Sequence, residues 1–65
     1  MNINKTIIKL QSDTITEEEF NTLSADIRDA IPNNEDYDII TYILDKDINT
    51  EEDIVKLIPN YNMTN

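Results

Sequence analysis

The sequence predicts an all-α fold, a compact three-helix bundle formed by one small acidic domain over residues 1–65. Three observations support this prediction: helix-start signatures recur, apolar residues recur at spacings of three and four, and two prolines follow such stretches. The predicted helices cover about 17–30, 34–45 and 51–58. The chain contains no Cys, so packing and helix caps must supply the stability that other small domains take from disulfides.

The first predicted helix, about 17–30, has the clearest start. Thr16-Glu17-Glu18-Glu19 is a capping box, in which the Thr hydroxyl accepts from the Glu19 amide and the Glu19 side chain reaches back to the Thr16 amide. Ile15 and Phe20 form the matching hydrophobic staple. Pro32 disfavours helical dihedrals at Ile31 and ends the helix. One apolar stripe follows the helix: Phe20, Leu23, Ile27, and Ala30 or Ile31.

The second and third predicted helices follow the same logic. The second, about 34–45, takes Asn33 or Asn34 as its cap and carries the widest apolar stripe: Tyr37, Ile39, Ile40, Ile43 and Leu44. The third, about 51–58, starts with Thr50 as cap and an acidic first turn, and Pro59 stops it. Its apolar residues are Ile54, Val55, Leu57 and Ile58.

Residues 1–11 fit two patterns. Thr6, Ile8 and Leu10 alternate as in a strand, whereas Ile3, Ile7 and Leu10 share one face of a helix. The β-branched residues favour a strand. We therefore expect an extended or strand-like segment, which would pair with the C-terminal tail or with a second copy, so that a homodimer remains possible.

The charge of the chain is strongly negative and unevenly placed. The net charge is −9, and all fourteen acidic residues lie between Asp13 and Asp53, where Arg28 and Lys46 are the only basic residues. Such a field repels nucleic acid and anionic membranes and attracts basic surfaces. We expect a protein partner with a basic surface, no direct nucleic-acid binding and no membrane binding. Without a long apolar run or a secretory signal, the expected location is cytoplasmic, in a bacterial or host cell interior.

The residue inventory argues against catalysis. Without His or Cys there is no imidazole base and no activated thiol, and without Gly there is no phosphate-binding glycine-rich loop. Asp26 and Asp29 lie one turn apart, as an acid and base pair would, but they lie off the apolar stripe and are better explained as solvated. We therefore expect neither an enzyme nor a cofactor.

A calcium loop is not expected either. Asp45, Asp47 and Asn49 match the first, third and fifth positions of an EF-hand loop. Thr50 and Lys56, however, occupy the positions that require Gly and a bidentate Glu. No metal site is predicted.

The acidic helix surfaces are the remaining candidates for a binding site. Carboxylates three or four residues apart on a helix lie about 5–6 Å from one another. To a basic groove on a partner protein, rows of such carboxylates resemble the spaced charges of a nucleic acid. The alternative is that the acids only keep a small domain soluble. We favour binding, because the segment 13–53 carries more net charge than the ~2–8 that solubility requires. The predicted partner-binding residues are Glu19, Asp26, Asp29, Glu35, Asp36, Asp38 and Asp45, with Tyr37 and Tyr42 as core-edge residues or interface anchors.

Two family resemblances suggest functions. From Ala25 to Ile58 the spacing resembles CUE/UBA ubiquitin-binding domains: Ala30-Ile31-Pro32 stands where that family has Met-Phe-Pro, and Leu57-Ile58 where it has a di-leucine. The resemblance implies ubiquitin contacts at Ala30, Ile31, Leu57 and Ile58. The stretch 13–20 is similar to the start of the first helix of colicin-type nuclease immunity proteins, which are small acidic helical inhibitors.

The leading functional hypothesis is a non-enzymatic inhibitor. It would dock on a basic surface of a nucleic-acid-handling protein, in the manner of a nucleic-acid mimic. Small size, acidity and a composition rich in Ile and Asn are also the profile of phage-encoded or mobile-element inhibitors of bacterial defence, anti-CRISPR proteins included. The alternative is a small adaptor domain that binds ubiquitin or a helical peptide through an apolar patch, or a bacteriocin-immunity-like protein.

Overall fold

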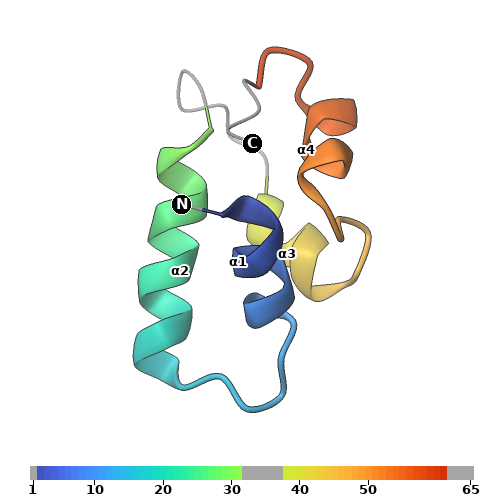
Figure 1. The fold of residues 1–65 in the computed structure, drawn as a ribbon. Helices are drawn as coiled ribbons and strands as arrows, with labels where there is room; N and C mark the ends of the chain where they lie inside the picture. The colour runs from blue at the N-terminus through green and yellow to red at the C-terminus, as the bar shows by residue number, and fades with distance from the viewer. Residues whose placement is uncertain (1, 32–37, 62–65) are drawn as a thin grey trace.

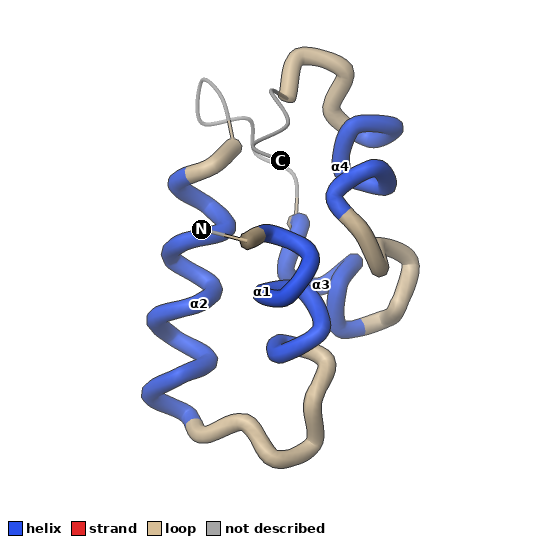
Figure 2. Tube along the Cα trace, in the orientation of Figure 1, coloured by secondary structure: helices blue, strands red, loops and turns tan. Residues whose placement is uncertain are grey.

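The computed structural model describes residues 2–31 and 38–61 and contains four helices (Figure 1). They are α1 (Ile3–Leu10), α2 (Glu17–Asp29), α3 (Ile39–Leu44) and α4 (Glu51–Leu57). The described ranges hold no β-strand, which confirms the predicted all-α class. α1 packs against both α2 and α3, and Figure 2 shows it between α2 and α4. None of the described helices has the length and hydropathy of a membrane-spanning segment.

The N-terminal segment was predicted to be extended or strand-like, and this prediction was wrong. The segment is helix α1, so the described chain has four helices where three were predicted. Ile3, Ile7 and Leu10 are at most 2% exposed, whereas Ile8 is 65% exposed. Burial therefore follows the spacing of three and four, and the apparent strand alternation through Ile8 has no structural role.

Local hydrogen bonds explain why this β-branched sequence is helical. The Asn2 side chain accepts from the Lys5 amide at 3.2 Å, which caps the first turn. The Thr6 hydroxyl donates to the Asn2 carbonyl at 3.1 Å. The Asn2 side chain thus satisfies an amide that a helix start otherwise leaves open, and packing of the apolar face supplies the rest of the stability.

Helix α2 confirms its predicted start and nearly its predicted end. It covers Glu17–Asp29, with Ala30 as its C-cap. The Glu19 amide donates to the Thr16 hydroxyl at 3.1 Å, and the Thr16 amide donates to the Glu19 carboxylate at 3.2 Å, which completes the capping box. Ile27 is fully buried on the inner face.

Helix α3 is described over Ile39–Leu44, the second half of the predicted 34–45. The predicted caps Asn33 and Asn34 lie outside the described residues. Its C-terminal end is a Schellman motif: Lys46 has φ 65°, its amide donates to the Ile43 carbonyl, and the Asp47 amide donates to the Tyr42 carbonyl. A glycine normally occupies the left-handed position of this motif, and this chain has none.

Helix α4 covers Glu51–Leu57, one residue shorter than the predicted 51–58. The Asp53 carboxylate accepts from the Thr50 amide at 3.2 Å and from the Asn49 amide at 2.9 Å. The acidic first turn thus caps the helix as the sequence indicates.

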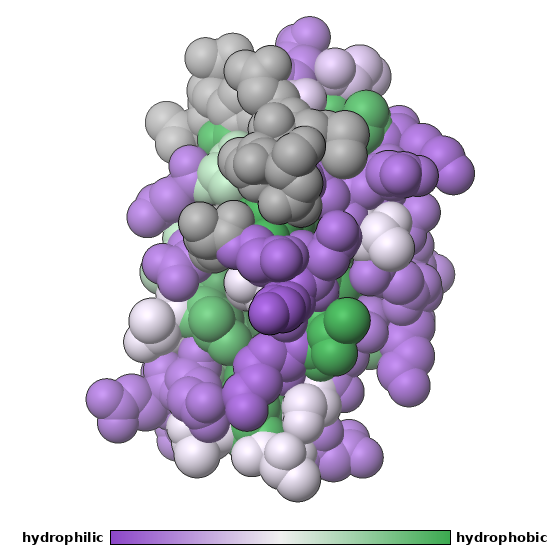
Figure 3. Space-filling view, in the orientation of Figure 1, coloured by the Kyte–Doolittle hydropathy of each residue, from purple (hydrophilic) through white to green (hydrophobic). Residues whose placement is uncertain are grey.

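The core is built mainly of isoleucine. Stiff β-branched side chains lose little rotamer freedom on burial, which helps a small domain that buries a limited area. The surface seen in Figure 3 is mostly hydrophilic, with small apolar areas between. The buried hydrophobic residues are Ile3, Ile7, Leu10, Ile27, Ile31, Ile39, Ile40, Ile43, Ile48, Ile54, Ile58 and Tyr61.

Gln11, directly after α1, joins α1 to the turn between α3 and α4. Its Nε2 donates to the Ile43 carbonyl at 3.0 Å, the Ile48 carbonyl at 3.1 Å and the Asn49 Oδ1 at 3.0 Å. The Ile43 carbonyl belongs to the last turn of α3 and also accepts from the Lys46 amide at 3.0 Å, so Gln11 adds a second donor there. One side chain therefore closes the end of α3 and fixes the loop that leads to α4.

A buried carboxylate joins α4 to both ends of the described chain. Glu51 is 0% exposed, and the Tyr61 hydroxyl donates to its Oε2 at 2.6 Å. The Glu51 amide donates to the Asn4 Oδ1 at 2.8 Å. The side chain and the backbone amide of Glu51 both make long-range hydrogen bonds, so this residue has a structural role.

We expect Lys46→Gly to stabilise the protein by about 0.5–1 kcal/mol, because glycine adopts the left-handed conformation without the Cβ clash that lysine has there. Urea unfolding followed by circular dichroism measures the change. Lys46→Ala is the control, since it removes the charge and keeps the Cβ. Equal stability of the Gly and Ala variants would contradict the interpretation.

We expect Gln11→Ala to destabilise the protein by about 1–3 kcal/mol, because the partly buried Ile48 carbonyl loses its side-chain donor and the Ile43 carbonyl keeps only the Lys46 amide. Gln11→Glu is the sharper variant, since it keeps the shape of the side chain and has no N–H group. Its thermal midpoint should fall at least as far as that of Gln11→Ala. A midpoint equal to that of the unchanged protein would show that the amide donors are unimportant.

Candidate functional site

The outer side of α2 carries a row of carboxylates that we call the α2 acidic face, made of Glu18, Asp26 and Asp29. They follow one another with Thr22 between, at spacings of three and four, so they share one side of the helix. Glu18 and Asp29 are exposed and Asp26 is half-exposed. The row is about 16 Å long at 1.5 Å per residue.

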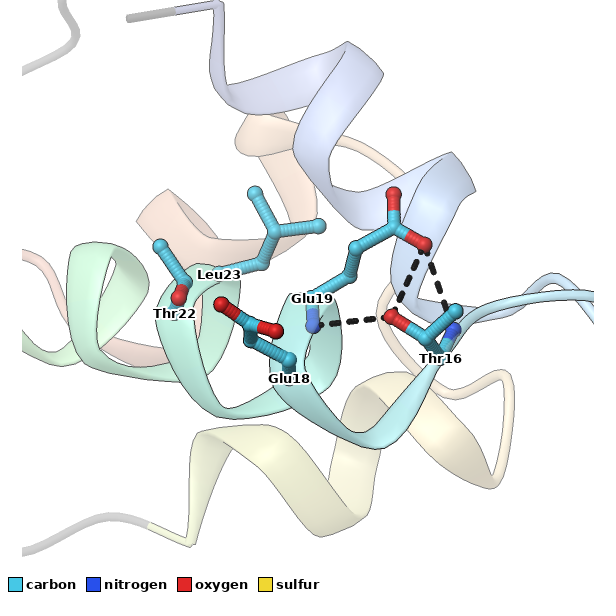
Figure 4. A pocket seen from close by; sticks show the side chains of 5 residues that line it. All are labelled: Thr16, Glu18, Glu19, Thr22 and Leu23. Atoms are coloured by element: carbon cyan, nitrogen blue, oxygen red, sulfur yellow. Dashed lines mark hydrogen bonds between the residues drawn. The ribbon is translucent and has the colours of Figure 1, made fainter.

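The first turns of α2 form a shallow pocket at one end of this row. Its volume is about 250 Å³. Figure 4 shows the half-buried Leu23 beside the carboxylates of Glu18 and Glu19. An apolar surface next to carboxylates suits a lysine or arginine, whose aliphatic stem packs while its charged head meets the oxygens. The pocket is lined by Thr16, Glu18, Glu19, Thr22 and Leu23.

Glu19, a predicted partner-binding residue, is already engaged within the protein. Its carboxylate accepts from the Thr16 amide and hydroxyl, and it lies 3.5 Å from the Lys9 ammonium. The backbone hydrogen bond from Thr16 lowers the pKa of Glu19 below its ordinary value of 4.5, with further contributions from the Thr16 hydroxyl and Lys9. The capping box is therefore the main role of this residue, and the exposed ion pair adds little.

The structure divides the predicted site residues between two helices. Asp38, Tyr42 and Asp45 lie on the outward side of α3, and Tyr42 is 38% exposed. α2 and α3 bury their inner stripes in the same core, so their acidic sides face different directions. Asp26 and Asp29 are brought together with Glu18, and the α3 residues form a second surface. The predicted Glu35, Asp36 and Tyr37 lie outside the described residues.

Sequence reasoning missed two kinds of residue. Glu18 and Thr22 were not predicted as site residues, although the spacing from Glu18 through Thr22 to Asp26 places them in the same row. The buried Glu51 was treated as an ordinary acidic residue of a helix start. No local signal indicates its burial, because Asn4 and Tyr61, which contact it, lie far along the chain.

Asp53 is a second acid with a structural role. The backbone hydrogen bond from Asn49 lowers its pKa below the ordinary value of 3.8, and the bond from the Thr50 amide acts in the same direction. Its negative charge is thus held at the start of α4, where a carboxylate suits the helix dipole.

The described residues contain no cluster of three or more His, Cys, Asp or Glu arranged to hold a metal ion. In the segment that resembles an EF-hand loop, the Asn49 Oδ1 accepts from Gln11 and the Asn49 Nδ2 donates to the Lys46 carbonyl at 2.8 Å. The side-chain oxygen at the fifth loop position therefore has a structural use.

Two of the four residues implied by the CUE/UBA resemblance are in the core. Ile31 is 9% exposed and Ile58 is 1% exposed, while Ala30 and Leu57 are half-buried. A partner would have to displace packed side chains in order to contact the two isoleucines. Ala30 and Leu57 are the two of these residues that a partner could contact without such a displacement.

No protein-family model matches the chain, and neither the curated proteins nor the solved structures contain a significant match.

The capping box of α2 makes the stability of the protein depend on pH. A carboxyl group with a lowered folded pKa stabilises the protein above its unfolded pKa, and the stabilisation is lost as the pH falls through the folded pKa. We expect the thermal midpoint to fall as the pH is lowered from above 4.5, and less steeply in Glu19→Gln. Glu18→Gln, which removes the same charge and keeps the capping box, should retain the steep fall. If Glu19→Gln followed the unchanged protein at every pH, the capping box would not be the cause.

Proposed function

We propose that this chain is a non-enzymatic acidic binding protein, an inhibitor that docks the α2 acidic face on a basic surface of a nucleic-acid-handling protein. Glu18, Asp26 and Asp29 would meet lysines or arginines of the partner, and the pocket beside Glu18 would accept one of their side chains. Occupying the basic surface would exclude nucleic acid from it. Such an inhibitor suits a phage or mobile element that acts against a bacterial defence nuclease.

The observation that carries this proposal is the exposure of unpaired carboxylates along one side of α2. The helix has five carboxylates and one arginine. The ion pair within the described residues, Lys9 with Glu19, lies outside the row. Like charges three or four residues apart destabilise a helix, so the Asp26 and Asp29 pair is an arrangement that folding alone does not favour.

The geometry of the row supports a basic groove as the complement. Its carboxylates are carried by one helix: Asp26 and Asp29 lie about 5–6 Å apart, and Glu18 lies about 12 Å along the helix from Asp26. A basic groove that binds phosphates one after another meets a comparable series of negative charges. Complementary fields of this kind speed the encounter and make binding sensitive to salt.

A charge-reversal experiment tests the proposal. The immobilised chain is incubated with nuclease-treated bacterial lysate at low salt, and captured proteins are eluted with a salt gradient. We expect a basic protein that elutes at moderate salt and is displaced by added duplex DNA. The triple variant Glu18→Lys, Asp26→Lys, Asp29→Lys should lower its affinity about 10- to 100-fold, since each lost charge pair contributes up to about 1 kcal/mol.

The matched control is Asp13→Lys, Glu17→Lys, Glu52→Lys, which changes the net charge equally at exposed positions outside the row. It should retain most of the binding. Equal loss in the two triple variants would show that only net charge matters, and capture that resists high salt and duplex DNA would exclude the electrostatic mechanism.

A further inference from the structure

A second surface feature lies between α3 and α4. It is an open groove of about 420 Å³, lined by Tyr42, Asp47, Ile48, Asp53, Lys56 and Leu57. Ile48 is buried, Leu57 is half-buried, and the Tyr42 ring is partly exposed. An aromatic ring with an apolar body and a polar tip is typical of interface anchors. The groove is therefore an apolar surface with a charged rim.

The walls of this groove are fixed by backbone hydrogen bonds. The left-handed turn at Lys46 folds the chain back, so that the amides of Asp47 and Ile48 donate to the Tyr42 carbonyl at 2.9 and 3.2 Å. Gln11 holds the Ile48 carbonyl from the other side. On α4, the bonds that Asp53 accepts fix the start of the helix. A preformed groove loses little conformational entropy when it binds.

Charge indicates which occupant the groove would accept. Its rim has Asp47 and Asp53 against one cation, Lys56, with Asp45 and Glu52 exposed nearby in the chain. The chain as a whole carries −9. Anionic ligands are repelled by this field, and cationic ones are attracted. An open groove also covers too little of a small molecule, since small-molecule sites bury about 70–90% of their ligand.

We propose that the groove between α3 and α4 binds a cationic amphipathic peptide segment of a partner protein. One large apolar side chain of the peptide packs against Tyr42 and Leu57, above the buried Ile48, and flanking lysines or arginines meet Asp47 and the neighbouring acids. This inference goes beyond the proposed function and does not use the α2 acidic face. It shares with that proposal only the cationic character of the partner.

A second copy of the chain is the competing occupant. The exposed Ile8 on α1 lies between Lys5 and Lys9 in the sequence, so α1 has an apolar residue flanked by positive charges. The net charge of −9 on each copy opposes such an association. A partner that is cationic throughout meets no such repulsion, and the observations therefore favour the peptide.

The test uses a short peptide of Ala and Lys with one central Phe. Titrated into the ¹⁵N-labelled protein, the peptide should shift the amide signals of Tyr42, Asp47, Lys56 and Leu57. The affinity is measured by the fluorescence anisotropy of the fluorescein-labelled peptide. Replacing the Phe of the peptide by Ala should weaken binding about tenfold or more, since burying a Phe side chain is worth about 1.5–3 kcal/mol. A peptide with Glu in place of Lys should not bind.

Protein variants locate the site. Tyr42→Ala should weaken binding about tenfold, and Leu44→Ala, which removes an exposed apolar side chain of the same helix outside the groove, should not change it. Lys56→Glu should tighten binding about threefold at low salt. If circular dichroism shows that Tyr42→Ala does not fold, the Lys56→Glu variant still tests the site. The triple α2 variant should bind the peptide within about threefold of the unchanged protein, which separates this inference from the proposed function.

Three results would overturn the inference. The first is equal binding of the peptide that lacks Phe, which would mean attraction by charge alone. The second is a set of amide shifts centred on α2. The third is a concentration-dependent dimer seen by sedimentation in the absence of peptide, with amide shifts at both the groove and Ile8. The occupant of the groove would then be a second copy of the chain.

Discussion

The side-chain amide of Gln11 is the contact on which the arrangement of the helices depends. It joins the end of α1 to the end of α3 and to the loop that leads into α4. A short helix such as α3 has few internal bonds and draws its stability from tertiary contacts. Gln11 adds a second donor to the Ile43 carbonyl at the end of α3, and the adjoining Schellman turn at Lys46 directs the chain into α4. Both walls of the groove between α3 and α4 follow from this junction.

Helices with a complete start signal were predicted closely from the sequence. The capping signatures at Thr16 and Thr50 fix where α2 and α4 begin, because they are local bonds within four residues. The N-terminal segment was misjudged because its β-branched residues fit both periods, and the choice between them is made by burial. Only the assembled core shows that Ile3, Ile7 and Leu10 face inward together. Propensity is a weak prior where tertiary packing decides.

The candidate surfaces show the same limit. Exposure of Asp29 follows from its position opposite the apolar stripe and the half-exposure of Asp26 from its position at the edge of that stripe, so the sequence could predict both. The groove could not be predicted, because it forms where α3, its following loop and α4 meet. The burial of Glu51 depends on Asn4 and Tyr61, which come from opposite ends of the chain. A site made by local periodicity can be read from sequence, whereas one made by long-range packing requires the fold.

The two proposals assign different physical tasks to the two surfaces. A row of fixed charges on α2 acts at a distance of about a Debye length, roughly 8 Å at physiological salt, and chiefly raises the association rate. An apolar groove with an aromatic wall acts at contact and chiefly slows dissociation. The α2 acidic face and the groove lie on different helices, so one partner that uses both must present a basic surface and a separate peptide segment. Two different partners would use different surfaces and would not compete with each other. The charge-reversed and groove variants would then affect different complexes.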